Sequence, residues 1–237
     1  MLRTFMWYFL GWAGLILTYP MLLCLKYYEL RGKTEQKNHL ANRQSQRLAR
    51  YLFKLTGSTV KITGLENVPR QGAVLFVSNH QGHMDSLIIH GYIDKPKGFI
   101  SIIEVLEYPI IRTWMKHIQC VFLDRKNARQ SSLCINQAIE RLKDGHSMVV
   151  FPEGHLNDGG DAGPFQRGWL RLATKSGVPI VPVSISGSYK ALAKDGSRVR
   201  SVQVACVISK PIYPDKLKKA DERTFIENLR AEILSHV

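Results

Sequence analysis

Residues 73–85 read Ala73-Val74-Leu75-Phe76-Val77-Ser78-Asn79-His80-Gln81-Gly82-His83-Met84-Asp85. The first part is a nearly continuous apolar run, which is typical of a strand buried on both faces of a sheet. The run stops at His80, passes a glycine and reaches Asp85 just before a second apolar run at 87–89. The sequence therefore predicts a titratable pair, His80 and Asp85, at the carboxyl end of a buried strand, where α/β folds tend to place their chemistry.

Strand-like and helix-like segments alternate along the rest of the chain. The predicted strands span 60–62, 73–78, 98–103, 120–123, 147–151, 180–185 and 202–208. The predicted helices span 34–55, 85–90, 108–117, 128–143, 166–176 and 221–235. This alternation indicates an α/β fold with a largely parallel sheet covered by helices. We expect a membrane anchor over 1–30, a basic amphipathic helical segment over 31–57 and a catalytic domain over 58–237.

The amino-terminal segment carries no charged residue from Thr4 to Leu25. At about 1.5 Å per residue, a helix of this length covers the roughly 30 Å hydrocarbon core of a bilayer. No small-residue cleavage site follows it, which disfavours a signal peptide. Pro20 predicts a kink, so two alternatives stay open: a helix that spans the membrane and an anchor that is partly embedded in it.

The chain is strongly basic, with 33 Lys and Arg against 19 Asp and Glu and a formal net charge of +14. Such a charge favours a polyanionic partner, either nucleic acid or an anionic membrane face. The apolar amino terminus favours the membrane, and no nucleic-acid partner is expected. Residues 26–61 carry nine basic side chains and two acidic ones, so the positive-inside rule predicts a catalytic domain on the cytoplasmic face. The amphipathic helix at 34–55 either lies against anionic headgroups or packs on the core with a solvated charged side.

His80 and Asp85 are five residues apart and would not share one face of a helix. They can meet only if the backbone turns between them, which Gly82 allows, and Asp85 or Ser86 can cap the helix that follows. Asp85 would then orient the imidazole and leave its second nitrogen free as a base. The chain has no Gly-x-Ser-x-Gly elbow and no suitably placed cysteine, so the nucleophile would be a hydroxyl of the substrate.

Three other stretches place polar groups at strand ends or helix starts: Phe122-Leu123-Asp124-Arg125, Phe151-Pro152-Glu153-Gly154 and Phe165-Gln166-Arg167-Gly168. Arg125 is suited to bidentate phosphate binding. Glu153 is expected on the same sheet edge as His80, and Arg167 opens a helix whose amino terminus favours anions. The sequence therefore predicts one anion-lined cleft at the carboxyl edge of the sheet.

In this order, residues 79–85, 122–125, 151–154 and 178–183 resemble the four motifs of the glycerolipid acyltransferase family, whose best-known branch is the 1-acylglycerol-3-phosphate acyltransferases. The resemblance covers roughly residues 60–210. It implies an acyl-CoA or acyl-carrier-protein donor, a lysophospholipid acceptor, no metal or other cofactor, and an α/β domain seated on the membrane. It implies that His80 is the general base and Asp85 its orienting partner. The substrate-binding residues that we expect are Arg125, Phe151, Pro152, Glu153, Gly154 and Arg167.

Two departures from the family pattern leave the acceptor open. The third motif usually continues with Thr or Ser and then Arg, but here His155-Leu156-Asn157 follows, and Ile103-Glu104-Val105 replaces a common Lys-Glu-Leu. Acylation of a different lyso-lipid is therefore one alternative. A catalytically silent membrane-binding protein of the same fold is another, and a metal hydrolase using His80, His83 and Asp85 is a third.

Overall fold

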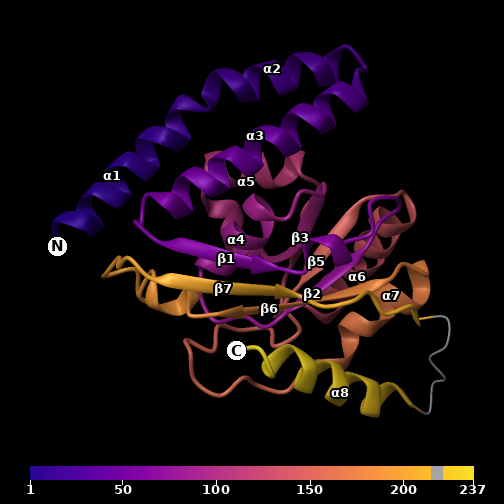
Figure 1. The fold of residues 1–237 in the computed structure, drawn as a ribbon. Helices are drawn as coiled ribbons and strands as arrows, with labels where there is room; N and C mark the ends of the chain where they lie inside the picture. Colours follow the sequence, from indigo (N-terminus) through magenta and orange to yellow (C-terminus); the bar gives the residue numbers. More distant parts are fainter. Residues whose placement is uncertain (215–220) are drawn as a thin grey trace.

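The computed structural model describes residues 1–214 and 221–237. A seven-stranded sheet lies at its centre, in the order β1-β7-β6-β2-β5-β3-β4 (Figure 1). The strands are β1 (Thr59–Thr63), β2 (Leu75–Ser78), β3 (Lys97–Ile102), β4 (Val121–Leu123), β5 (Ser147–Val150), β6 (Ile180–Ser186) and β7 (Gln203–Ile208). In the described residues every neighbouring pair is parallel except β6 and β7. The predicted α/β fold with a largely parallel sheet is confirmed.

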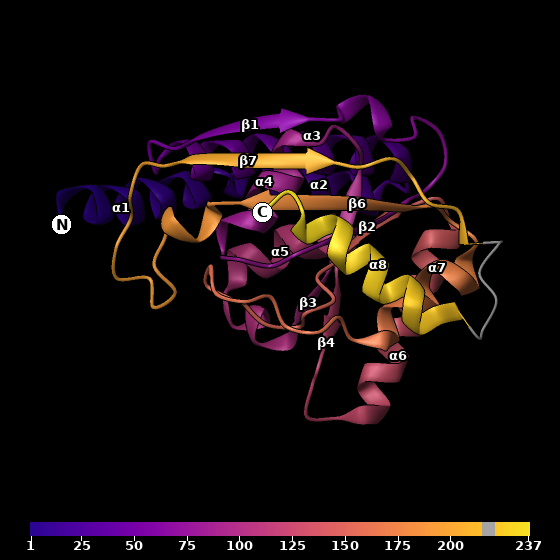
Figure 2. The same cartoon turned by 60° about the horizontal axis from the view of Figure 1, so that its bottom comes forward.

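Helices cover both faces of this sheet. They are α1 (Leu2–Leu17), α2 (Tyr19–Leu30), α3 (Thr34–Lys54), α4 (Met84–Tyr92), α5 (Pro109–His117), α6 (Ala128–Lys143), α7 (Leu170–Ser176) and α8 (Glu222–Leu234). Helices α3 and α4 lie on one face of the sheet, and α6, α7 and α8 lie on the other (Figures 1 and 2). Their buried side chains form two separate cores. Along β2, Phe76 enters the first core while Leu75 and Val77 enter the second. This two-sided burial explains why β2 is an unbroken apolar run.

The apolar amino terminus forms α1 and α2, which are separated at Thr18 just before Pro20. Together they make a helical segment, Leu2–Leu30, that is long and apolar enough to cross a membrane by length and composition, with a mean hydropathy of 1.6. The break agrees with the kink that Pro20 predicts, since proline disfavours an uninterrupted helix. The chain then reverses at Gly32, and α2 lies beside α3 (Figure 1).

Hydrogen bonds tie this segment to the rest of the molecule along its length. Trp7 Nε1 donates to the Leu52 carbonyl at 3.0 Å, and Trp114 Nε1 donates to Thr18 Oγ1 at 2.9 Å. A helix that crossed the bilayer steeply would have to give up these contacts. The segment therefore packs along the rest of the described chain, and both forms of membrane anchor stay predictions.

Helix α3 is the basic amphipathic helix of the sequence. Its apolar side, including Ala41, Ala49 and Phe53, is buried, and Arg50 Nη1 donates to the Gly91 carbonyl of α4 at 2.8 Å. The structure thus corresponds to the alternative in which the helix packs on the core. The proposed division of the chain at residues 30 and 57 stays a prediction.

One local expectation is wrong, and a second is met with a different first turn. Helix α4 begins at Met84 with His83 as its N-cap residue, so neither Asp85 nor Ser86 caps it. The helix predicted over 166–176 starts with a 3₁₀ turn, Arg167–Trp169, and becomes α-helical only at Leu170. Gly168 lies in that first turn, where glycine weakens a regular helix.

Candidate active site

The structure brings His80 and Asp85 together. His80 Nδ1 lies 2.9 Å from Asp85 Oδ2, although the two residues follow β2 and occupy the first turn of α4, respectively. The Asp85 carboxylate turns back toward the preceding loop and also accepts a hydrogen bond from Gly82 N at 2.9 Å. Asp85 is fully buried, whereas 19% of the His80 side chain is exposed. One end of the pair is therefore fixed inside the protein, and the other reaches the surface.

Gly82 is required here for a reason that differs from the expected one. It does not adopt a positive φ. A Cβ at this position would instead lie 2.9 Å from the Cα of Tyr189, closer than real Cβ contacts. The glycine therefore permits the loop after β2 to pack directly against the segment after β6.

The His80 imidazole is fixed by a stacked ring on its face as well as by the Asp85 carboxylate at Nδ1. Phe151, directly after β5, stacks on it with 3.9 Å between ring centroids and 13° between planes. Because the carboxylate of Asp85 can only accept a hydrogen bond, Nδ1 carries the proton, and neutral His80 has its lone pair on Nε2. This is the arrangement of a general base.

Glu153 lies on the same sheet edge as His80, as predicted, because β5 pairs in parallel with β2. Its carboxylate is buried and accepts from the backbone N–H of His80 at 2.7 Å, from Asn157 Nδ2 at 3.0 Å and from Gly163 N at 3.3 Å. These donors make Glu153 an anchor for the His80 backbone, and its expected contact with substrate stays a prediction. The neighbouring Pro152 is buried, and Gly154 has a φ of +75°.

The two predicted phosphate-binding arginines are exposed. Arg125 follows β4, which is separated from β5 by β3, so it lies at the same edge of the sheet but farther from His80 than Glu153. Arg167 lies in the 3₁₀ turn before α7. Neither guanidinium makes a hydrogen bond or ion pair within residues 1–214 and 221–237, which leaves both available to an anion.

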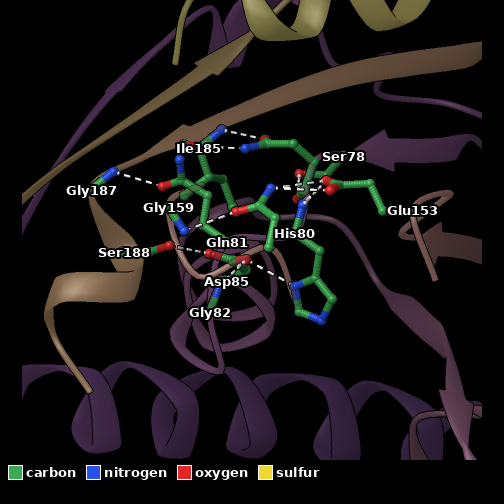
Figure 3. Close-up of polar contacts among 12 residues, drawn as sticks. Ser78, His80, Gln81, Gly82, Asp85, Glu153, Gly159, Ile185, Gly187 and Ser188 are labelled. Carbon is green, nitrogen blue, oxygen red and sulfur yellow. Dashed lines mark hydrogen bonds and ion pairs between the residues drawn. The ribbon is translucent and has the colours of Figure 1, made fainter. Parts of the chain in front are cut away.

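Three polar residues that the sequence did not single out complete the site (Figure 3). The Asn79 side-chain amide exchanges two 2.8 Å hydrogen bonds with the backbone of Ile185. Gln81 Oε1 accepts from Gly187 N at 2.8 Å, and Ser188 Oγ donates to Asp85 Oδ1. Asn79 and Gln81 flank His80 in the motif and could have been suspected. Ser188 is 103 residues from Asp85, and nothing local distinguishes it from other serines.

The cysteines do not offer a nucleophile at this site. Burial raises the pKa of the Cys120 thiol to about 12 and that of Cys134 to about 11. Burial and, after it, the charge of Asp85 raise the pKa of Cys206 to about 12. These thiols are neutral at physiological pH and therefore unreactive. In the part of the chain that the structure describes, no three His, Cys, Asp or Glu side chains are grouped so that they could hold a metal ion.

Comparisons with known proteins identify the family of this chain. A family model described as "Acyltransferase" matches residues 59–186. A probable 1-acyl-sn-glycerol-3-phosphate acyltransferase of Mycoplasma pneumoniae is 33% identical over 198 residues, which cover 79% of this chain and 74% of that protein. A chloroplastic 1-acyl-sn-glycerol-3-phosphate acyltransferase of Brassica napus is 33% identical over 65% of this chain and 45% of its own length.

A solved structure is similar over almost the whole chain. It is the 1-acyl-sn-glycerophosphate (LPA) acyltransferase PlsC from Thermotoga maritima, with a TM-score of 0.84, 26% identity, and coverage of 99% of this chain and 94% of that one. An α/β fold with a hydrogen-bonded histidine and aspartate at the carboxyl edge of its sheet is consistent with an enzyme that activates a hydroxyl. This chain belongs to the acyltransferase family and is an enzyme of that class.

Proposed function

We propose that this enzyme transfers a fatty acyl chain from acyl-CoA or acyl-carrier protein to the free hydroxyl of 1-acyl-sn-glycerol-3-phosphate, giving phosphatidic acid. The observation that carries the proposal is the 2.9 Å contact between His80 Nδ1 and the buried Asp85 carboxylate, which leaves Nε2 as a base. The names of the relatives from Mycoplasma pneumoniae and Brassica napus support this choice of acceptor.

In the proposed reaction, His80 Nε2 removes the proton of the acceptor hydroxyl as its oxygen attacks the thioester carbonyl. A C–O bond forms, the C–S bond breaks, and the proton passes from His80 to the departing thiolate. Asp85 keeps the proton on Nδ1 and stabilises the imidazolium that forms between the two transfers. No covalent intermediate on the protein is needed.

Arg125 and Arg167 are proposed to attract the phosphate of the acceptor or the phosphates of the donor, since guanidinium groups bind phosphate bidentately. Phe151 to Gly154 would line the reaction site through ring stacking and backbone contacts. The chain would need no metal or other cofactor, and nucleic acid would not be a partner.

The amino-terminal helices would hold this site at the membrane. Exposed apolar side chains run along them: Leu2, Phe5, Phe9, Ile16, Leu17, Leu23 and Leu30. Burying such a face in a bilayer releases water from apolar surface and is favourable. We propose that α1 and α2 lie partly embedded in the cytoplasmic leaflet, where lysolipid substrate and phospholipid product both dissolve. Floating the protein on vesicles, with and without Phe5→Glu and Phe9→Glu, tests this placement.

The decisive experiment supplies purified protein with an acyl thioester and a panel of lysolipids, and follows thiol release and the lipid product. Wild-type protein should convert lysophosphatidate, and His80→Ala should lose at least about a thousandfold of that rate, the order expected for loss of an essential base. Activity should survive a chelator. Full thiol release by His80→Ala would end the proposed mechanism.

One observation favours a second candidate acceptor. Leu156 stands where the family usually has an arginine after the third motif, so one expected cation is absent. If only lysolipids without a phosphate monoester are acylated, the second candidate is correct and lysophosphatidate is not the substrate.

A further inference from the structure

We propose that Ser188 is a positioning residue that acts on the base through Asp85, so that Ser188, Asp85 and His80 work as one hydrogen-bonded chain. The inference rests on the proposed role of His80 as the base. It assigns a function to the segment after β6, which none of the sequence motifs contains.

The geometry around Asp85 carries the proposal. Oδ2 accepts from His80 Nδ1 and Gly82 N, while Oδ1 accepts from Ser188 Oγ. Figure 3 shows the carboxylate between the imidazole on one side and the serine on the other. Both Asp85 and Ser188 are fully buried. Both groups are shielded from bulk water, so Ser188 is the donor that Oδ1 has among the described residues.

The placement of Ser188 is built into the fold rather than incidental. Gly187 has a φ of +86° and turns the chain directly before Ser188. Its backbone N–H is held by Gln81, and Ile185 is held by Asn79. Both of those side chains flank His80. The loop that carries the base therefore fixes the same segment that supplies the donor to its orienting carboxylate.

The hydroxyl of Ser188 affects His80 electrostatically as well as sterically. Its O–H dipole points its positive end at the carboxylate, and this reduces the negative potential that Asp85 exerts on the imidazole. Without the hydroxyl, the carboxylate would attract imidazolium more strongly, and His80 would bind a proton at higher pH. The carboxylate would also lose one of its three fixed donors and hold the ring less firmly.

The test compares Ser188→Ala with Ser184→Ala. Ser184 is a matched control because it is a buried serine of β6, the strand that leads to Ser188, and its hydroxyl has no partner among the described residues. Ser188→Ala should lower kcat about tenfold, the effect of one lost hydrogen bond to a charged group, while KM changes less than about twofold. The acid limb of its kcat profile should move upward by about half a pH unit. Ser184→Ala should change none of these quantities.

A second readout does not need activity. The titration of the His80 ring can be followed by nuclear magnetic resonance of histidine-labelled protein in detergent, with the signal assigned from the spectrum of His80→Ala. Ser188→Ala should shift its midpoint upward, and Ser188→Cys, which keeps a weak donor, should give an intermediate shift. If wild-type protein acylates no lysolipid, the proposed function fails, yet this titration still tests the link to Ser188.

Three outcomes would overturn the proposal. The first is a Ser188→Ala titration midpoint that equals that of wild type. The second is a loss of kcat that Ser184→Ala reproduces. The third is that both Ser188→Ala and Ser188→Cys fail to fold, by circular dichroism, while Ser184→Ala folds, because Ser188 would then be a stability residue only.

Discussion

The two edges of the central sheet bury charged groups in opposite ways. At the carboxyl edge, the buried carboxylates of Asp85 and Glu153 each accept hydrogen bonds from three residues of the protein. At the amino edge, the buried bases Lys97 and His146, together with His90 of α4, have no carboxylate as a hydrogen-bond partner among the described residues. Burial lowers the pKa of Lys97 to about 7 and holds the pKa of His90 well below 6.5.

The comparison shows that burial has different consequences for a charged group with hydrogen-bond donors around it and for a base without a carboxylate partner. Donors arranged around a carboxylate replace the water that an anion loses on burial, so charge can be used for catalysis. A buried base with only carbonyl or hydroxyl partners is disfavoured in its charged form, so it makes stability depend on pH. Substitutions at the first edge should therefore affect the reaction, and those at the second should affect the pH dependence of folding.

The largest effect is expected from Asp85→Asn at the carboxyl edge. The amide removes the negative charge that stabilises the imidazolium, and its NH2 group could face Nδ1 only by also facing the Gly82 N–H, so kcat should fall by about a thousandfold or more. The folded state should persist, since the side chain keeps its shape. Turnover with saturating thioester and acceptor measures this, and activity above a tenth of wild type would contradict the assigned role.

Glu153→Gln should have the next largest effect. Its amide group must face at least one of the backbone N–H groups of His80 and Gly163, and a buried donor left unpaired costs about 1–3 kcal/mol of unfolding free energy. Activity should fall with it because the His80 backbone is released. The matched control is Glu227→Gln on the surface of α8, where the ion pair with Arg223 is exposed. Equal losses of melting temperature in the two variants would show that Glu153 is not a structural anchor.

Lys97→Met tests the amino edge. Between pH 7 and 10.5 the unfolded chain binds a proton that native Lys97, with a pKa of about 7, does not bind. Stability contributed by this site therefore rises with pH across that window, by at most about 1.4 kcal/mol per pH unit. In Lys97→Met, the melting temperature should therefore rise less with increasing pH than in wild type. Lys175→Met, at an exposed position of α7, should keep the wild-type rise. A rise unchanged in Lys97→Met would mean that the buried lysine keeps its charge.

The smallest effect is expected for His90→Leu. Burial lowers the pKa of His90 below 6.5, so the unfolded chain binds the extra proton as pH falls below 6.5 and the native state loses stability there. His90→Leu should remove part of that loss, about 1 kcal/mol between pH 6.5 and 5.5. His146, whose pKa is also lowered by burial, should preserve the remainder. Melting temperatures at pH 5.5 and 7.5 measure this effect. The drop between the two pH values should be smaller in His90→Leu than in wild type, and the exposed control His39→Leu should show the wild-type drop.

The secondary structure and the pairing of His80 with Asp85 could be predicted because their signals are local. The β2 run and its abrupt end at His80 indicate a strand buried on both faces and a polar loop after it. Hydrophobic period, segment length and flanking turn residues together distinguish the strands from the helices. The motif order also pointed to the family. Helix starts were less predictable, since capping near His83 and the 3₁₀ turn at Arg167 depend on contacts outside each helix.

By itself, the sequence determined the alternating elements, the apolar amino terminus, and the presence of His80 and Asp85 at a strand end, because these follow from side-chain type and spacing along the chain. Only the tertiary structure decided that Glu153 holds the His80 backbone, that Ser188 reaches Asp85, and that the amino-terminal helices pack along the domain. The physical reason is the strand order: β6 and β5 flank β2 in space, although more than sixty residues separate each of them from it along the chain. No local pattern encodes which of these distant ends meet.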